Sequence, residues 1–210
     1  MVDHIESISV KAPCPAPRIH HPALAPAILR MKTAFLLKIE KNIGSEANEL
    51  QDRQNKVALL HKIMKKINEK LDPSGQLTAA DFQQIMTDLR TTLTAKRDAK
   101  LEGVEVNPEN QARIDKINQS YEDLMAEVAD VEKAGNGMLG KGKLLTKDQC
   151  GRLVENIRMT VEDLNTENEM QMTKVSRLHS ERLEMFQFIK SILKSEHDAK
   201  TNHARKMDGR

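Results

Sequence analysis

Residues 36–71 read LLKIEKNIGSEANELQDRQNKVALLHKIMKKINEKL, and the apolar side chains in this stretch recur every seven residues. The repeat has two sets of positions, offset by three residues: Leu36, Ile43, Leu50, Val57, Met64 and Leu71, then Ile39, Leu60 and Ile67. An apolar seam this regular predicts a coiled-coil helix rather than an ordinary globular helix. At 1.5 Å per residue, the helix from residue 26 to residue 71 is about 70 Å long. Two positions on the seam, Glu46 and Arg53, are charged.

A second long helix is expected over residues 147–206, with Thr146 as its N-cap. Three polar residues, Asn168, Gln171 and Arg182, interrupt its seam. The apolar members of that seam are Val154, Ile157, Val161, Leu164, Val175, Leu178, Met185, Ile189 and Ile192. Two amphipathic helices of this length bury their seams most simply by packing against each other, so we expect an antiparallel hairpin.

The residues between the two long helices predict a smaller helical insert. The turn residues 72–75 end the first long helix, and shorter helices follow over residues 78–100 and 108–133. Asn107 and Pro108 supply the N-cap and first helical residue of the second of these. We expect no β-strand. The chain is therefore predicted to be all-α, with four regions: residues 1–22 (a flexible N-terminal arm), 23–72, 73–143 and 144–210.

The charged seam positions suggest a register for the hairpin. If Leu36 faces Ile192 and Ile43 faces Met185, Glu46 lies opposite Arg182. A shift by one heptad places Arg53 against Arg182 or leaves both charges unpaired, which costs several kcal/mol inside a seam. We therefore predict that Glu46 pairs with Arg182 and fixes the register. In the alternative, both charged side chains lean outward to solvent.

Some apolar residues of the last helix are not used by its seam. Met159, Met170 and Leu183 lie outside it, and four more flank it: Met172, Phe186, Phe188 and Leu193. The flanking residues can pack against the insert, whereas the outward ones predict a second, intermolecular surface. Methionine suits such a surface because its side chain is flexible and polarizable. These seven residues are the predicted partner-binding set.

Composition excludes several classes of function. Lys+Arg 33 against Asp+Glu 31 gives a net charge of +2, without the basic excess typical of a nucleic-acid binder. The chain contains no Trp, one Tyr and four Phe, so aromatic-lined ligand pockets are not expected. No apolar stretch reaches the roughly 18 residues of a membrane span. Residues 1–10 lack the features of a cleavable secretory signal.

No motif predicts catalysis, a metal or a cofactor. The glycines of residues 135–143 match the spacing of a nucleotide-binding loop, but a helix precedes them where a strand is required. We therefore expect an exposed, flexible loop there. His20 and His21 lack supporting ligands nearby, and no Ser/His/Asp or Cys/His set stands out. The predicted function is accordingly not enzymatic.

The C-terminal part of the chain resembles the closing helix of type III secretion filament and needle-tip proteins. The matching segments are LLTKDQ at 144–149 and residues 165–193, which include EMQM at 169–172 and SERLEMF at 180–186. FIKSILK at 188–194 and a short charged tail follow. The resemblance covers about 60 residues of helical pattern. The first long helix is similar only in pattern, and the insert is not similar.

The resemblance implies export through a secretion apparatus, directed by an uncleaved N-terminal signal to which residues 1–22 correspond. It also implies assembly at the needle tip or in an extracellular filament, through contacts of the C-terminal helix. The implied partners are further copies of the chain, needle or translocator proteins, and a small cytoplasmic chaperone before export. The implied location is the bacterial surface. The alternative is a cytoplasmic coiled-coil adaptor or chaperone that is never exported.

Overall fold

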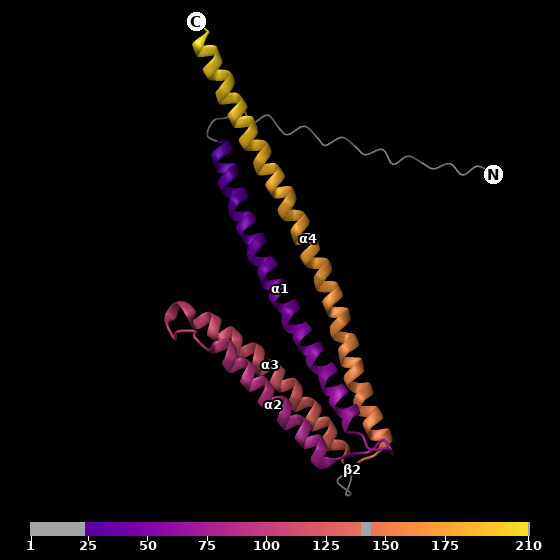
Figure 1. Ribbon diagram of the computed structural model, residues 1–210. Coiled ribbons are helices and arrows are strands. Elements are labelled where there is room, and N and C mark those ends of the chain that lie inside the picture. Colours follow the sequence, from indigo (N-terminus) through magenta and orange to yellow (C-terminus); the bar gives the residue numbers. More distant parts are fainter. Residues whose placement is uncertain (1–23, 140–143, 210) are drawn as a thin grey trace, which may run out of the picture. The chain divides into compact units, whose positions relative to one another are not determined.

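The computed structural model describes residues 24–139 and 144–209, and within them the chain is all-α, as predicted (Figure 1). The N-terminal and C-terminal helices are long and pack against each other, and a hairpin of two shorter helices is inserted between them in sequence. The helices are α1 (Leu24–Lys70), α2 (Ala79–Leu101), α3 (Pro108–Met138) and α4 (Lys147–Asp208).

The chain divides into two compact units, each of which is described by itself. Gly44–Ser176 form one, which we call the four-helix unit because it contains parts of α1 and α4 and all of α2 and α3. Met1–Ile43 and Arg177–Arg210 form the other, which we call the two-helix unit; its described residues are 24–43 and 177–209.

The four-helix unit has a continuous hydrophobic core. Leu60, Ile63 and Ile67 of α1 are fully buried, as is Phe82 of α2. α2 and α3 pack along each other, and α4 contributes Leu153, Ile157 and Val161 to the same cluster. The heptad pattern predicted Leu60 and Ile67, but Leu59 and Ile63 lie outside that pattern and are also buried. They are buried because the α2–α3 hairpin covers a second face of α1, which a two-helix seam does not use.

The predicted turn and helix caps are present in this unit. Asp72 Oδ1 accepts hydrogen bonds from the backbone N–H groups of Ser74 and Gln76, at 2.9 and 2.7 Å. Gly75 has a φ of 78°, a conformation that favours glycine. Asn107 caps α3 as predicted, by accepting from the N–H of Asn110, whereas Thr78, expected as the first residue of its helix, is the N-cap of α2. These local signals are fixed by side-chain chemistry, which is why sequence predicts them well.

The prediction that the chain has no strand is wrong. β1 (Leu77–Thr78) pairs antiparallel with β2 (Leu144–Leu145), with Leu77 opposite Leu145. Both of these leucines are fully buried. Strands of two residues are too short to show the alternation of apolar and polar residues that predicts a strand. The two strands also lie far apart in the sequence, so no local pattern predicts their pairing. This small ladder holds together the two ends of the insert.

The prediction of a glycine-rich loop over 135–143 is wrong at its start. α3 continues to Met138, so Gly135 and Gly137 are helical. Gly135 is buried, and a Cβ placed there would clash with Cζ of the Phe82 ring. The glycine therefore permits close packing of α3 on the Phe82 ring. The remaining residues, 140–143, lie outside the described residues.

In the two-helix unit, α1 and α4 run antiparallel along a narrow seam. Leu36 and Ile39 of α1 are buried, as are Leu178 and Ile192 of α4. Lys32 Nζ lies 5.1 Å from the centre of the Phe188 ring, so the two helices also meet through a cation–π contact. No helix within the described residues is long and apolar enough to cross a membrane.

Candidate functional site

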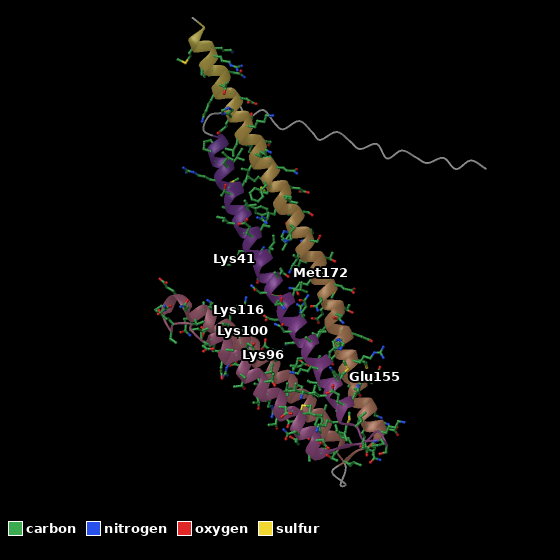
Figure 2. The ribbon with its side chains drawn as sticks, viewed as in Figure 1. Lys41, Lys96, Lys100, Lys116, Glu155 and Met172 are labelled. Carbon is green, nitrogen blue, oxygen red and sulfur yellow. The ribbon has the colours of Figure 1, made fainter. Side chains whose placement is uncertain are left out.

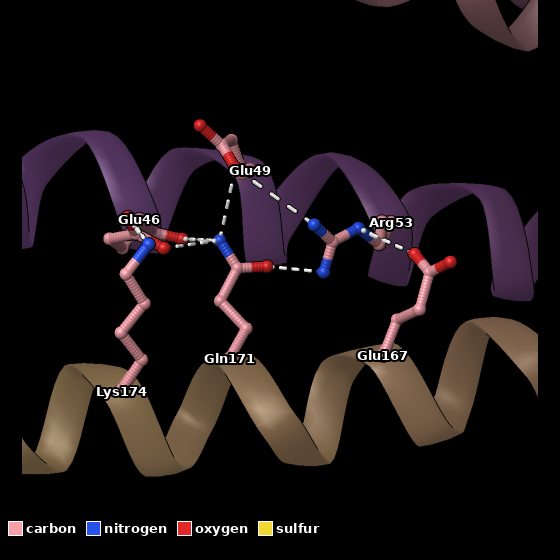
Figure 3. A network of polar contacts seen from close by, with 6 residues as sticks. All are labelled: Glu46, Glu49, Arg53, Glu167, Gln171 and Lys174. Carbon is pink, nitrogen blue, oxygen red and sulfur yellow. Dashed lines mark hydrogen bonds and ion pairs between the residues drawn. The ribbon is translucent and has the colours of Figure 1, made fainter.

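The seam of the four-helix unit contains a polar cluster of residues from α1 and α4 (Figure 3). Gln171 lies at its centre and is only 4% exposed. Its Nε2 donates to the backbone oxygen of Glu46 at 2.9 Å, to Glu46 Oε2 at 3.1 Å and to Glu49 Oε2 at 3.2 Å. Arg53 donates from Nη1 to the Gln171 side-chain oxygen. The buried amide is therefore satisfied on both its donor and its acceptor side.

Ion pairs surround this buried amide. Lys174 Nζ lies 2.5 Å from Glu46 Oε1, and Arg53 Nε lies 3.3 Å from Glu167 Oε2. The Lys174 ammonium, bonded to the carboxylate, holds the pKa of Glu46 below its usual value, and Gln171 adds to this effect. Burial of the carboxylate opposes the shift. The cluster thus keeps Glu46 ionised within the seam.

The predicted pairing of Glu46 with Arg182 is wrong. Glu46 pairs with Lys174, which precedes Arg182 by about two helical turns, and Arg182 pairs with Glu40 at 3.2 Å within the two-helix unit. The observed register places Gln171 between Glu46 and Arg53, so one amide satisfies both charged seam positions of α1. The predicted register provided a partner for Glu46 only.

Most of the predicted partner-binding residues are exposed. Met159, Met170, Met172, Leu183, Phe186 and Leu193 each have at least 42% of their surface exposed. Phe188 is partly buried, because Lys32 covers its ring. In the four-helix unit, Met159 and Met170 lie on the face of α4 opposite its buried residues, whereas Met172 lies at the side. α1 adds three exposed apolar residues in the two-helix unit: Met31, Phe35 and Leu37.

The four-helix unit also has a groove that the sequence did not reveal. It has a volume of about 560 Å³, and its apolar floor includes Leu59, Leu93 and Tyr121. Lys62 of α1 and Lys96 and Lys100 of α2 line it, and none of its lining residues is acidic. Lys96 and Lys100 are four residues apart and therefore share a helix face. Their convergence with Lys62 depends on how three helices pack, so no sequence signal identifies this groove.

No group of three or more His, Cys, Asp or Glu residues in the described part of the chain could hold a metal ion. Cys150 is a free thiol buried in the core, where desolvation raises its pKa. His20 and His21 lie outside the described residues. The two surface features of note in the described residues are the exposed apolar side chains on α4 and the lysine-lined groove.

Comparisons with protein-family models, curated proteins and solved structures find no significant match to this chain. Any functional conclusion therefore depends on the residues and geometry of the chain itself.

Proposed function

We propose that this chain is an exported structural component of a type III secretion system. It acts at the needle tip or as a subunit of an extracellular filament, and it self-assembles through its C-terminal helix. The observation that carries the proposal is the set of large apolar side chains that α4 leaves exposed, among them Met159, Met170 and Leu183, which are 57%, 64% and 62% exposed. Large apolar side chains that a helix leaves exposed are typical of a surface that other chains cover.

The sequence resemblance gives the proposal its context. The segments that resemble secretion filament and tip proteins lie in α4, the helix on which these exposed side chains occur, except that LLTKDQ begins in β2. The N-terminal and C-terminal helices also pack against each other, which is the arrangement that the resemblance implies. In this function the partners are other copies of the chain and needle or translocator proteins, with a small chaperone before export.

Self-assembly is tested by measuring mass against concentration. We expect light scattering of the purified chain to show mass rising with concentration, and negative-stain microscopy to show rings or fibres. Met170→Asp should keep the helical content of the wild type and lose assembly, because a carboxylate replaces an exposed apolar contact. Asn165→Asp is the matched control, since Asn165 is an exposed polar residue of α4 and gains the same charge. Equal assembly of the two variants would contradict a role for Met170.

Export is tested separately, in cells that carry a type III apparatus. Deletion of residues 1–22 should retain the protein inside the cell while leaving its helical content unchanged. If the full-length chain stays inside the cell and remains monomeric at every concentration, the cytoplasmic adaptor becomes the better description.

A further inference from the structure

We call the groove lined by Lys62, Lys96 and Lys100 of the four-helix unit the lysine groove. It combines positive charge with an apolar floor, and no described residue fills it. Lys62, Lys96 and Lys100 are exposed at its rim, and none of them forms an ion pair within the described part of the chain. Lys100 Nζ lies 5.4 Å from the centre of the Tyr121 ring, so one rim cation is also held against the apolar floor. A ligand that fits here carries carboxylates flanking an apolar side chain.

The chain itself presents such a ligand on α4. Glu155, Met159 and Glu162 are exposed and recur at spacings of four and three residues, so they share one face of the helix. We call this set the acidic stripe. Glu155 forms no ion pair with a described residue, and Glu162 pairs only with the exposed Arg158, at 3.2 Å. Arg152 is the other cation near this face.

The dimensions of the two surfaces agree. Glu155 and Glu162 are separated by seven residues, or about 10 Å along the helix. The groove wall on α2 runs from Leu89 to Lys100, which is about 16 Å. The groove wall is therefore long enough to face both carboxylates of the stripe, together with Met159 between them.

We infer that the lysine groove binds the acidic stripe of α4 from a second copy of this chain. The inference rests on the self-assembly proposed above and names the surfaces that mediate it. The same copy cannot fill its own groove, because the stripe lies on the face of α4 that points away from the core shared with α1. Figure 2 labels Lys96 and Lys100 on the α2–α3 hairpin and Glu155 on α4.

A contact of this kind propagates. The groove and the stripe are different patches of one chain, so the contact is head-to-tail and generates a ring or an open filament rather than a closed two-fold dimer. It is also electrostatic. Association therefore weakens at about 1 M salt, where the Debye length falls to about 3 Å.

The test reverses the charge of each surface in turn. Lys62→Glu with Lys96→Glu reverses the groove and keeps the Lys100–Tyr121 contact; Glu155→Lys with Glu162→Lys reverses the stripe. Each variant alone should associate at least about tenfold more weakly than the wild type, since like charges then face each other. Lys116→Glu with Lys133→Glu is the matched control, because it alters two exposed lysines of α3 outside the groove. The control should associate as the wild type does.

Mixing the two reversed variants gives the decisive measurement. In the mixture every groove meets a stripe of opposite charge on the other variant, so sedimentation velocity should show association restored to the wild-type level. Restoration also shows that both variants are folded. If a wild-type chain associates but the reversed variants associate equally well, or if the mixture stays dissociated, this docking is wrong while the proposed function stands. A wild-type chain that is monomeric at every concentration overturns this docking and the proposed self-assembly, whereas the export experiment decides the proposed export separately.

Discussion

The four-helix unit and the two-helix unit contain parts of the same two long helices, yet they bury them very differently. In the four-helix unit, Leu60, Ile63, Ile67 and Phe82 are fully buried in one continuous cluster. In the two-helix unit, the most buried residue is Ile39, at 3% exposed, and most of the large exposed apolar residues of the described chain lie here. They are Met31, Phe35, Leu37, Leu183, Phe186, Leu193 and Met207.

The difference in burial follows from the number of faces of each long helix that other helices cover. Two helices bury one seam each, and the α2–α3 hairpin covers a further face of α1. Where that hairpin is absent, apolar residues beside the seam remain in contact with water. Regions with few buried apolar contacts open more readily than the core. The two-helix unit accordingly leaves more of its large apolar side chains in contact with water than the four-helix unit does.

Core truncation should give the largest effect and the clearest contrast between the units. Phe82→Ala removes a fully buried ring and should lower the free energy of unfolding by about 3–5 kcal/mol. Ile192→Ala in the two-helix unit should lower it by about 2 kcal/mol, the low end for such a truncation, because water can enter the site that the side chain vacates. Urea unfolding followed by circular dichroism measures both. Equal losses would mean that the two-helix seam is as well packed as the core.

A smaller effect is expected where α3 approaches α2. Gly135→Ala places a methyl group against the buried Phe82 ring and should cost about 1–3 kcal/mol. Gly137→Ala is the matched control on the same helix: beyond the adjacent residues and the helix's own backbone, no described atom lies within 4 Å of a Cβ built there, so it should stabilise by up to about 1 kcal/mol. Thermal unfolding of the two variants should therefore shift in opposite directions. A stabilised Gly135→Ala variant would mean that the Phe82 ring moves freely.

The sequence predicted the fold correctly where the pattern involves neighbouring residues, as in a heptad repeat or a helix cap. The heptad of α1 and the caps at Asn107 and Thr146 depend on side chains close together in the chain, and the structure contains them. The β1–β2 ladder and the continuation of α3 through Gly135 depend on distant contacts instead. Gly135 resembles a loop residue by composition, and only the Phe82 ring beside it explains a helical glycine there.

The residues of the candidate site also divide into those that sequence predicted and those that it did not. The apolar repeat of the last helix alone placed Met159 and Met170 outside the seam, and both are exposed. The predicted register is wrong because a heptad repeat is compatible with several offsets between the two helices. The residue that distinguishes the observed offset, Gln171, is neutral. Gln171 was identified as an interruption, but its amide bonds to both Glu46 and Arg53, which a search for opposite charges does not consider.

Charge exchange in the two-helix unit should give a smaller change and tests the observed register. Arg182→Glu places two carboxylates together, because Arg182 lies 3.2 Å from Glu40, and should destabilise by about 0.5–1 kcal/mol at this partly exposed position. Adding Glu40→Arg should restore most of the loss. Adding Glu46→Arg instead should not, since Glu46 pairs with Lys174. Rescue by Glu46→Arg would support the register predicted from sequence.

The smallest effect concerns pH and the polar cluster of the four-helix unit. Lys174 lowers the pKa of Glu46 in the folded chain, so folding favours the ionised carboxylate. The stability that this ionisation contributes is present above the usual Glu value of 4.5 and is lost as pH falls through the lower pKa of the folded state. Glu46→Gln should therefore unfold at a lower temperature than the wild type at pH 7, and the difference should shrink below pH 4.5. Glu184→Gln, at an exposed position of α4, is the control for the loss of one carboxylate and should unfold at nearly the wild-type temperature at pH 7. A Glu46→Gln difference of equal size at neutral and acidic pH would mean that the amide substitution perturbs packing around Gln171 rather than the ionised pair.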